Sequence, residues 1–147
     1  MKIKNLFLYL FILSFALCKP TIQKINALDG VLDLSDIQFS DSNVYKLEGN
    51  WEFYWNELLN PEDFLQKSNP SYIKVPRSWN GYNWNSKTID AIGYATFRLK
   101  IKLPTESPPL AITMKEQGTA FKVIVNKEMI KESGKVGKDE LSSIPRT

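Results

Sequence analysis

The stretch that decides the fold is Leu47-Glu48-Gly49-Asn50-Trp51-Glu52-Phe53-Tyr54-Trp55. Its odd-numbered positions carry leucine, glycine and three large aromatic residues, whereas its even-numbered positions are mostly polar. An alternation of period two places successive side chains on opposite faces, which is typical of a strand with one buried face. We therefore expect Trp51, Phe53 and Trp55 to lie in a core and the two glutamates to face solvent.

Other segments downstream and upstream repeat this alternation. The clearest one covers residues 93–103, where apolar side chains alternate with Arg98, Lys100 and Lys102. The other predicted strands cover residues 28–34, 72–76, 110–114, 120–125 and 129–131. A hairpin corner is predicted at Asn126-Lys127, and a short helix at residues 60–65, where asparagine, proline and two acids follow one another. Together these segments predict an all-β domain, an antiparallel β-sandwich with charged outer faces.

The N-terminus has the pattern of a secretory signal peptide. Lys2 and Lys4 precede an apolar run over residues 6–17. That run is shorter than the roughly 20 residues of a membrane-spanning helix, and Ser14-Phe15-Ala16 fits a signal peptidase site. We expect residues 1–17 to be the signal peptide, 18–27 a tether and 28–147 the folded domain of a protein exported to the periplasm or cell envelope. The alternative is an uncleaved N-terminal anchor.

Cys18 stands directly after the apolar run and suggests a lipoprotein acylated at that cysteine. The preceding Phe15-Ala16-Leu17 fits a lipobox poorly, because the residue before the cysteine is usually Gly, Ala or Ser. The alternative is an ordinary cysteine that is discarded with the signal. A single cysteine also excludes an internal disulfide and a paired-cysteine redox centre.

The composition excludes several kinds of chemistry. The chain has no histidine, so it contains neither a Ser-His-Asp relay nor a histidine-ligated zinc. The net charge of +3 falls to about +1 without Lys2 and Lys4, and no Lys/Arg stripe suits a nucleic-acid backbone. We expect no enzyme, no catalytic residues, no cofactor, no metal site and no nucleic-acid partner.

Charged residues on the predicted strands offer two weak candidates. Glu48 and Glu52 share a face but lie about 13 Å apart at about 3.3 Å per residue, which is too far for either glycosidase geometry. Arg98 belongs to a basic ladder with Lys100 and Lys102 that suits an anionic ligand. For both sets the alternative is a solvated outer face, which in the ladder also protects a sheet edge from unwanted pairing.

The sharper candidate is a loop at residues 77–86, called the aromatic loop below. Its ring and amide side chains alternate: Trp79, Asn80, Tyr82, Asn83, Trp84 and Asn85. Sugar C–H faces stack on flat rings while amides meet the hydroxyl groups. The pattern predicts a small carbohydrate or similar ligand at Trp79, Tyr82, Asn83 and Trp84. Core packing is the alternative, favoured for Trp79, which follows a strand closely, and open for Tyr82 and Trp84.

Several motifs in one order resemble a known family. They are L-x-G-x-W-E-F-Y-W-x-x-L-L over residues 47–59, V-P-R-S-W over 75–79, G-Y-A-T-F-R-L over 93–99, A-F-K-V-I-V-N over 120–126 and S-G-K-V-G over 133–137. From about Gly30 to Pro145 the chain resembles the extracytoplasmic N-terminal domain of bacterial seven-transmembrane receptors with diverse intracellular signalling modules. The resemblance implies a galactose-binding-like jelly roll that senses a ligand. A weaker likeness connects it to the sugar-binding jelly roll of β-galactosidases and β-glucuronidases.

Two departures from that family pattern shape the expectations. Lys127 stands where the family usually has glycine. A jelly roll needs about eight strands, so we expect a domain that is incomplete at its C-terminus, with uncovered strand edges that favour self-association. Membrane association would then come from a lipid anchor or from an absent downstream membrane domain. The alternative functions are an accessory sugar-binding domain of a glycoside hydrolase and a structural envelope lipoprotein.

Overall fold

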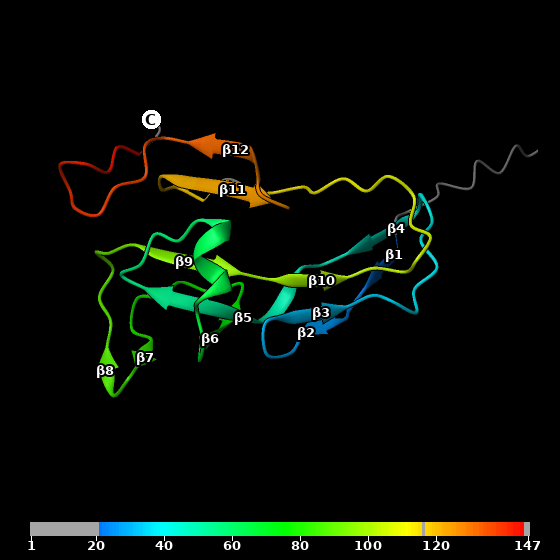
Figure 1. The fold of residues 1–147 in the computed structure, drawn as a ribbon, viewed down its shortest axis with the longest axis horizontal. Coiled ribbons are helices and arrows are strands. Elements are labelled where there is room, and N and C mark those ends of the chain that lie inside the picture. The colour runs from blue at the N-terminus through cyan, green and yellow to red at the C-terminus, as the bar shows by residue number, and fades with distance from the viewer. Residues whose placement is uncertain (1–20, 116, 146–147) are drawn as a thin grey trace, which may run out of the picture.

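A computed structural model describes residues 21–115 and 117–145 of the chain, so the predicted signal peptide and Cys18 lie outside the described residues. The described elements are strands and one short 3₁₀ helix, which confirms the all-β class (Figure 1). The elements are β1 (Thr21–Gln23), β2 (Asn26–Ala27), β3 (Val31–Asp33), β4 (Asn43–Tyr45), β5 (Glu48–Trp55), η1 (Pro61–Leu65), β6 (Ser71–Val75), β7 (Asn83–Trp84), β8 (Lys87–Thr88), β9 (Ala95–Arg98), β10 (Lys100–Lys102), β11 (Phe121–Val125) and β12 (Glu128–Ser133).

Strand β5, which covers nearly all of the alternating residues 47–55, is the centre of the largest sheet. It pairs antiparallel with β6 and with β9, and parallel with β2. Phe53 is paired with both Ser71 of β6 and Phe97 of β9, so these two strands lie on opposite edges of β5. The expected strand is therefore confirmed, and neighbouring strands cover both of its edges.

Two hydrophobic clusters form the core around this sheet. One is centred on Phe53, Ile73 and Ile89, and Trp55 packs against it. The other is centred on Ala27, Leu32 and Leu34, with Trp51 packed against it. The predicted core aromatics of β5 thus divide between two clusters, because the strand continues from one to the other.

The sheets are mixed rather than purely antiparallel, which corrects one prediction. β1 pairs parallel with β4, β3 with β10, and β2 with β5. The predicted strand over residues 93–103 is two strands, since β9 pairs with β5 and β10 turns to β3. The backbone N–H of Lys100 donates to the carbonyl of Gly30 at 2.8 Å at this change of partner. The jelly-roll topology and the facing layers of a sandwich stay predictions.

The predicted tether is also partly wrong, because residues within it form β1 and β2. Ala27 is buried and its backbone lies against Gly49 of β5. Gly49 has a φ of +118°, and a Cβ there would stand 2.3 Å from the backbone nitrogen of Ala27. Only glycine permits this approach, so an isolated glycine in the β5 pattern marks the place where β2 docks.

The two hairpin corners have the same turn chemistry. Asn126 and Lys127 join β11 to β12 with φ values of +50° and +76°, and Asn85 and Ser86 join β7 to β8 with +47° and +62°. Two successive residues with positive φ are typical of a type I′ turn. The predicted Asn126-Lys127 corner and the strand before it are confirmed, whereas residues 110–114 form no strand.

Candidate functional site

The three rings of the aromatic loop pack onto the cluster around Phe53 and are half-buried. Trp79 meets Trp55 edge-to-face at 5.6 Å between ring centroids. Tyr82 meets Phe53 edge-to-face at 6.0 Å. These rings therefore pack on the core, and the three residues also remain partly exposed.

Each ring is also tied to the scaffold by its polar atom. The Nε1 of Trp79 donates to the carbonyl of Ala91 at 3.2 Å, and the hydroxyl of Tyr82 donates to the carbonyl of Tyr72 at 2.5 Å. The Nε1 of Trp84 donates to the Oγ of Ser71 at 3.0 Å. Sequence reasoning had no way to find these partners, since they come from the separate strand β6 and from the chain after β8.

The asparagines of the aromatic loop are exposed. The Oδ1 of Asn83 accepts from the hydroxyl of Thr88 at 2.9 Å, across the β7–β8 hairpin. Within the described part of the chain, no hydrogen bond involves the side-chain amide of Asn80 or Asn85. The structure therefore gathers the three rings on one cluster and leaves the asparagine side chains of the same loop exposed.

Glu52 is a buried charge that the alternation on β5 did not reveal. It was expected to face solvent, but its exposed fraction is only 4%. Its carboxylate lies 3.2 Å from the Nη1 of Arg98 and 3.4 Å from the Nζ of Lys100, and it accepts from the Tyr54 hydroxyl at 2.9 Å. Because Arg98 and Lys100 neutralise this carboxylate, the basic ladder is largely paired within the protein.

Aromatic contacts explain why the side of β5 that carries Glu52 and Tyr54 is buried. The guanidinium of Arg98 lies over the ring of Phe64 in η1 at 4.3 Å, and the ring of Tyr54 meets Phe64 edge-to-face at 5.3 Å. Gly30 makes room for Glu52, because a Cβ there would stand 2.5 Å from the glutamate Cγ. Burial, followed by the hydrogen bond to Glu52, raises the pKa of Tyr54 to about 12.

The rest of the ladder is also occupied. The Nζ of Lys102 lies 3.0 Å from a carboxylate oxygen of Asp33. Hydrogen bonds from the hydroxyl and backbone N–H of Ser35, and then from Lys102, lower the pKa of Asp33 to about 2. A carboxylate oxygen of Glu48 lies 3.5 Å from the Nζ of Lys46.

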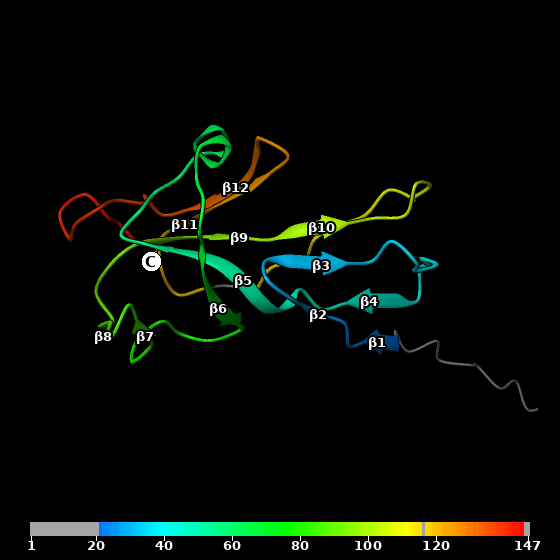
Figure 2. The same ribbon diagram turned by 60° about the horizontal axis from the view of Figure 1, so that its bottom comes forward.

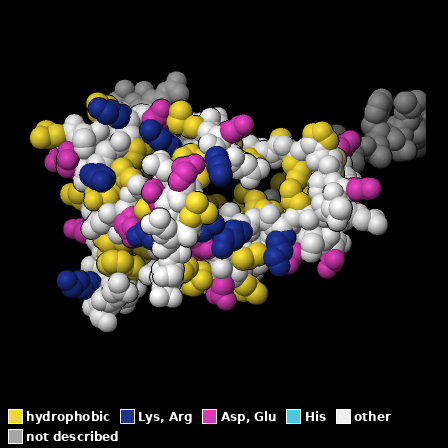
Figure 3. Space-filling model, in the orientation of Figure 1, with side chains coloured by type: hydrophobic (Ala, Val, Ile, Leu, Met, Phe, Trp, Pro, Cys, Tyr) yellow, Lys and Arg dark blue, Asp and Glu magenta, His cyan; other side chains and the backbone are white. Residues whose placement is uncertain are grey.

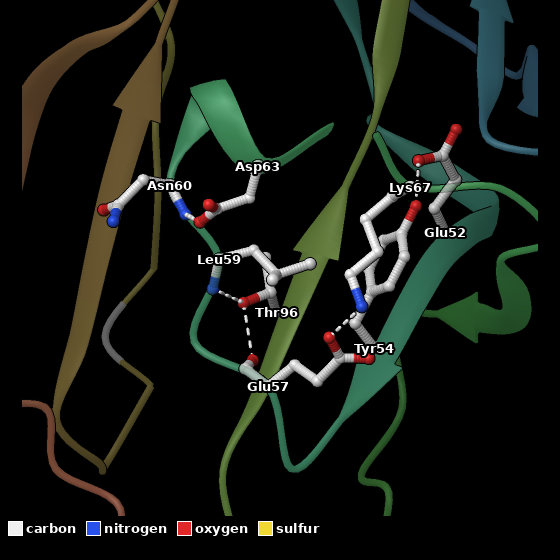
Figure 4. Close-up of polar contacts among 8 residues, drawn as sticks. All are labelled: Glu52, Tyr54, Glu57, Leu59, Asn60, Asp63, Lys67 and Thr96. Carbon is white, nitrogen blue, oxygen red and sulfur yellow. Dashed lines mark hydrogen bonds and ion pairs between the residues drawn. The ribbon is translucent and has the colours of Figure 1, made fainter. Parts of the chain in front are cut away.

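The corner in Figure 4 is held by hydrogen bonds between β9 and the chain before η1. The Thr96 hydroxyl accepts from the backbone N–H of Leu59 at 2.9 Å and donates to the carbonyl of Glu57 at 2.8 Å. Asp63 accepts from the backbone N–H of Asn60 at 2.7 Å, as predicted for a capped helix start, and Lys67 pairs with Glu57. These contacts fix η1 over the Glu52 face.

Two features of the described residues concern metals and membranes. Residues 21–115 and 117–145 contain no group of three or more metal-ligating side chains, and none of their helices has the length and hydrophobicity to span a bilayer.

No protein-family model, curated protein or solved structure matches the chain. The candidate site therefore rests on its own geometry.

Proposed function

We propose that the chain is a non-catalytic, extracytoplasmic ligand-binding module, related to the sensor domains of membrane signalling receptors, and that it binds a small carbohydrate or similar ligand at the aromatic loop. One observation carries the proposal: the half-buried rings of Trp79, Tyr82 and Trp84 are held by their own polar atoms in the same loop as Asn80 and Asn85, whose exposed amides make no hydrogen bond within the described part of the chain.

The physical argument is preorganisation. A ring that is already fixed loses little conformational entropy when a ligand stacks on it. An exposed amide supplies both a donor and an acceptor, which matches the hydroxyl groups of a neutral sugar. The β7–β8 hairpin carries Asn85 at its tip and projects from one end of the molecule, away from the β11–β12 hairpin (Figure 1). A ligand can therefore approach from solvent.

The extracytoplasmic part of the proposal rests on the sequence. Lys2, Lys4 and the apolar run over residues 6–17 favour export. The ordered motifs from Gly30 to Pro145 support a relation to receptor sensor domains. The Glu52 carboxylate is buried and already paired with Arg98 and Lys100, so the proposal gives it no part in ligand chemistry.

The test removes the free amides without disturbing the rings. Asn80→Ala deletes one amide at an exposed position, and Asn85→Gly deletes the other while retaining a residue that tolerates positive φ. Calorimetric titration with a panel of neutral mono- and oligosaccharides should show affinity falling about tenfold for each variant, the value of roughly one hydrogen bond. The thermal midpoint should stay unchanged.

The matched control is Asn126→Gly, which makes the same change at the equivalent corner of the β11–β12 hairpin. It should leave affinity unaltered. Absence of binding by any sugar in the panel, or equal losses for Asn85→Gly and Asn126→Gly, would exclude a carbohydrate site at the aromatic loop.

A further inference from the structure

Residues 110–114 form a stretch with strand character but no strand partner. Their sequence, Leu110-Ala111-Ile112-Thr113-Met114, alternates large and small side chains and carries no charge. Residues 110–114 belong to the connection between β10 and β11, the yellow trace in Figure 1 and Figure 2, and contain no turn or bend themselves. Short, uncharged segments of this composition pair readily with other strands.

The backbone of this stretch is unsatisfied within the described part of the chain. No hydrogen bond there reaches an N–H or C=O of residues 110–114. Leu110, Ile112 and Met114 are 49%, 49% and 37% exposed. Figure 3 shows the molecule hollowed next to β10, with hydrophobic side chains at the border of the hollow. Apolar Ile101 of β10 and the adjacent Leu103 are also exposed.

We propose that residues 110–114 pair antiparallel with the same residues of a second copy of this chain, with Ile112 opposite Ile112 on the two-fold axis. In this register Leu110 faces Met114 of the second copy and Ala111 faces Thr113, so large side chains meet large ones on one face. A two-fold interface requires a surface complementary to itself, and this alternating sequence has that property.

The flanking residues favour this register. Lys115 falls opposite Pro109 of the second copy, so no like charges oppose each other. Pro108 and Pro109 lack backbone donors and therefore end the ladder. The charged edge of β12, with Glu128, Lys131 and Glu132, offers no comparable uncharged match.

The first experiment uses disulfide trapping in the full chain carrying Cys18→Ser, so that each introduced cysteine is alone. Ile112→Cys should form an oxidised dimer, because opposite residues of an antiparallel pair lie about 4.5–5.5 Å apart at Cα, within disulfide range. Thr113→Cys is the matched control: it faces position 111 and should cross-link at least about tenfold more slowly. Equal rates at 112 and 113, no dimer at 112, or a mixed disulfide with another protein would overturn the proposal.

The second experiment measures the dimer dissociation constant by sedimentation in the same background. Ile112→Lys places two lysines opposite each other and should weaken association by roughly 100-fold, a loss of about tenfold from each copy. Leu141→Lys adds the same charge at a residue that is 95% exposed and should change nothing. At protein concentrations below the parent's dissociation constant, thermal melts of both variants should match the parent, because both sites face solvent in the monomer. A monomeric parent, or a dimer indifferent to Ile112→Lys, would show that this stretch is not the interface.

Discussion

Strand β5 and residues 110–114 both alternate large with smaller or polar side chains, yet they differ in strand pairing and in burial. β5 is paired along both edges, and its Phe53 is 1% exposed. Residues 110–114 have no partner in the described chain, and their large side chains are about half-exposed. Alternation therefore describes what a strand is able to bury, whereas neighbouring strands decide whether it does so.

We call the sheet of β2, β5, β6 and β9 the central sheet. The largest expected difference between it and the β11–β12 hairpin is the loss of stability when a core side chain is shortened. Phe53→Ala should lower the free energy of unfolding by about 3–5 kcal/mol, because it removes a fully buried ring at the centre of an aromatic cluster. Val123→Ala in β11 should cost less than about 1 kcal/mol, since Val123 is only half-buried. Urea unfolding followed by tryptophan fluorescence measures both. Similar losses would mean that the hairpin shares the core of the sheet.

The second expectation concerns charge within β5. Glu52→Ala should destabilise the fold by about 1–3 kcal/mol, because it leaves Arg98, Lys100 and the Tyr54 hydroxyl without their shared partner. Glu48→Ala, four residues earlier on the same strand, removes only a partly exposed pair with Lys46 and should cost about 0.5 kcal/mol or less. Chemical denaturation at neutral pH separates the two. A neutral outcome for Glu52→Ala would show that the buried pairs only offset their own desolvation.

The third expectation is a loss of stability at alkaline pH that is specific to the central sheet. The folded state raises the pKa of Tyr54 from 10.0 to about 12. A raised pKa in the folded state stabilises it fully below pH 10, and that stabilisation is lost as pH rises toward 12. Tyr54→Phe should remove this part of the decline in thermal midpoint between pH 9.5 and 11.5. Parallel pH profiles for the parent and the variant would contradict the burial of the hydroxyl.

The smallest expected effect lies in the hairpin turn. Lys127 has a φ of +76°, a conformation that glycine adopts without strain. Lys127→Gly should stabilise the β11–β12 hairpin by about 1 kcal/mol, which slows its amide hydrogen exchange about fivefold. Among the described strands, β11 and β12 pair only with each other, so exchange in β5 should not change. Equal slowing in β5 would show that the two regions open as one unit.

Local patterns in the sequence predicted the local structure well. The period-two alternation at residues 47–55 identified β5, and the Asn-Pro start identified η1. Pairing partners depend on contacts distant in sequence, so the parallel approach of β2 to Gly49 and the change of partner after Arg98 were not predicted. The prediction that Glu52 faces solvent was wrong for the same reason. Its side of β5 is covered by η1, and its carboxylate is neutralised by two cations from β9 and β10. In the aromatic loop, the residue types were predictable, but the acceptors that tie each ring to the scaffold were not.

The early docking of the chain has a consequence for distance from a lipid surface. β1 begins at Thr21 and is already paired with β4. Only three peptide steps separate Cys18 from Thr21, and three extended residues span about 10 Å. An acyl group on Cys18 would therefore hold Thr21, the first described residue, within about 10 Å of the cysteine and so close to the lipid headgroups.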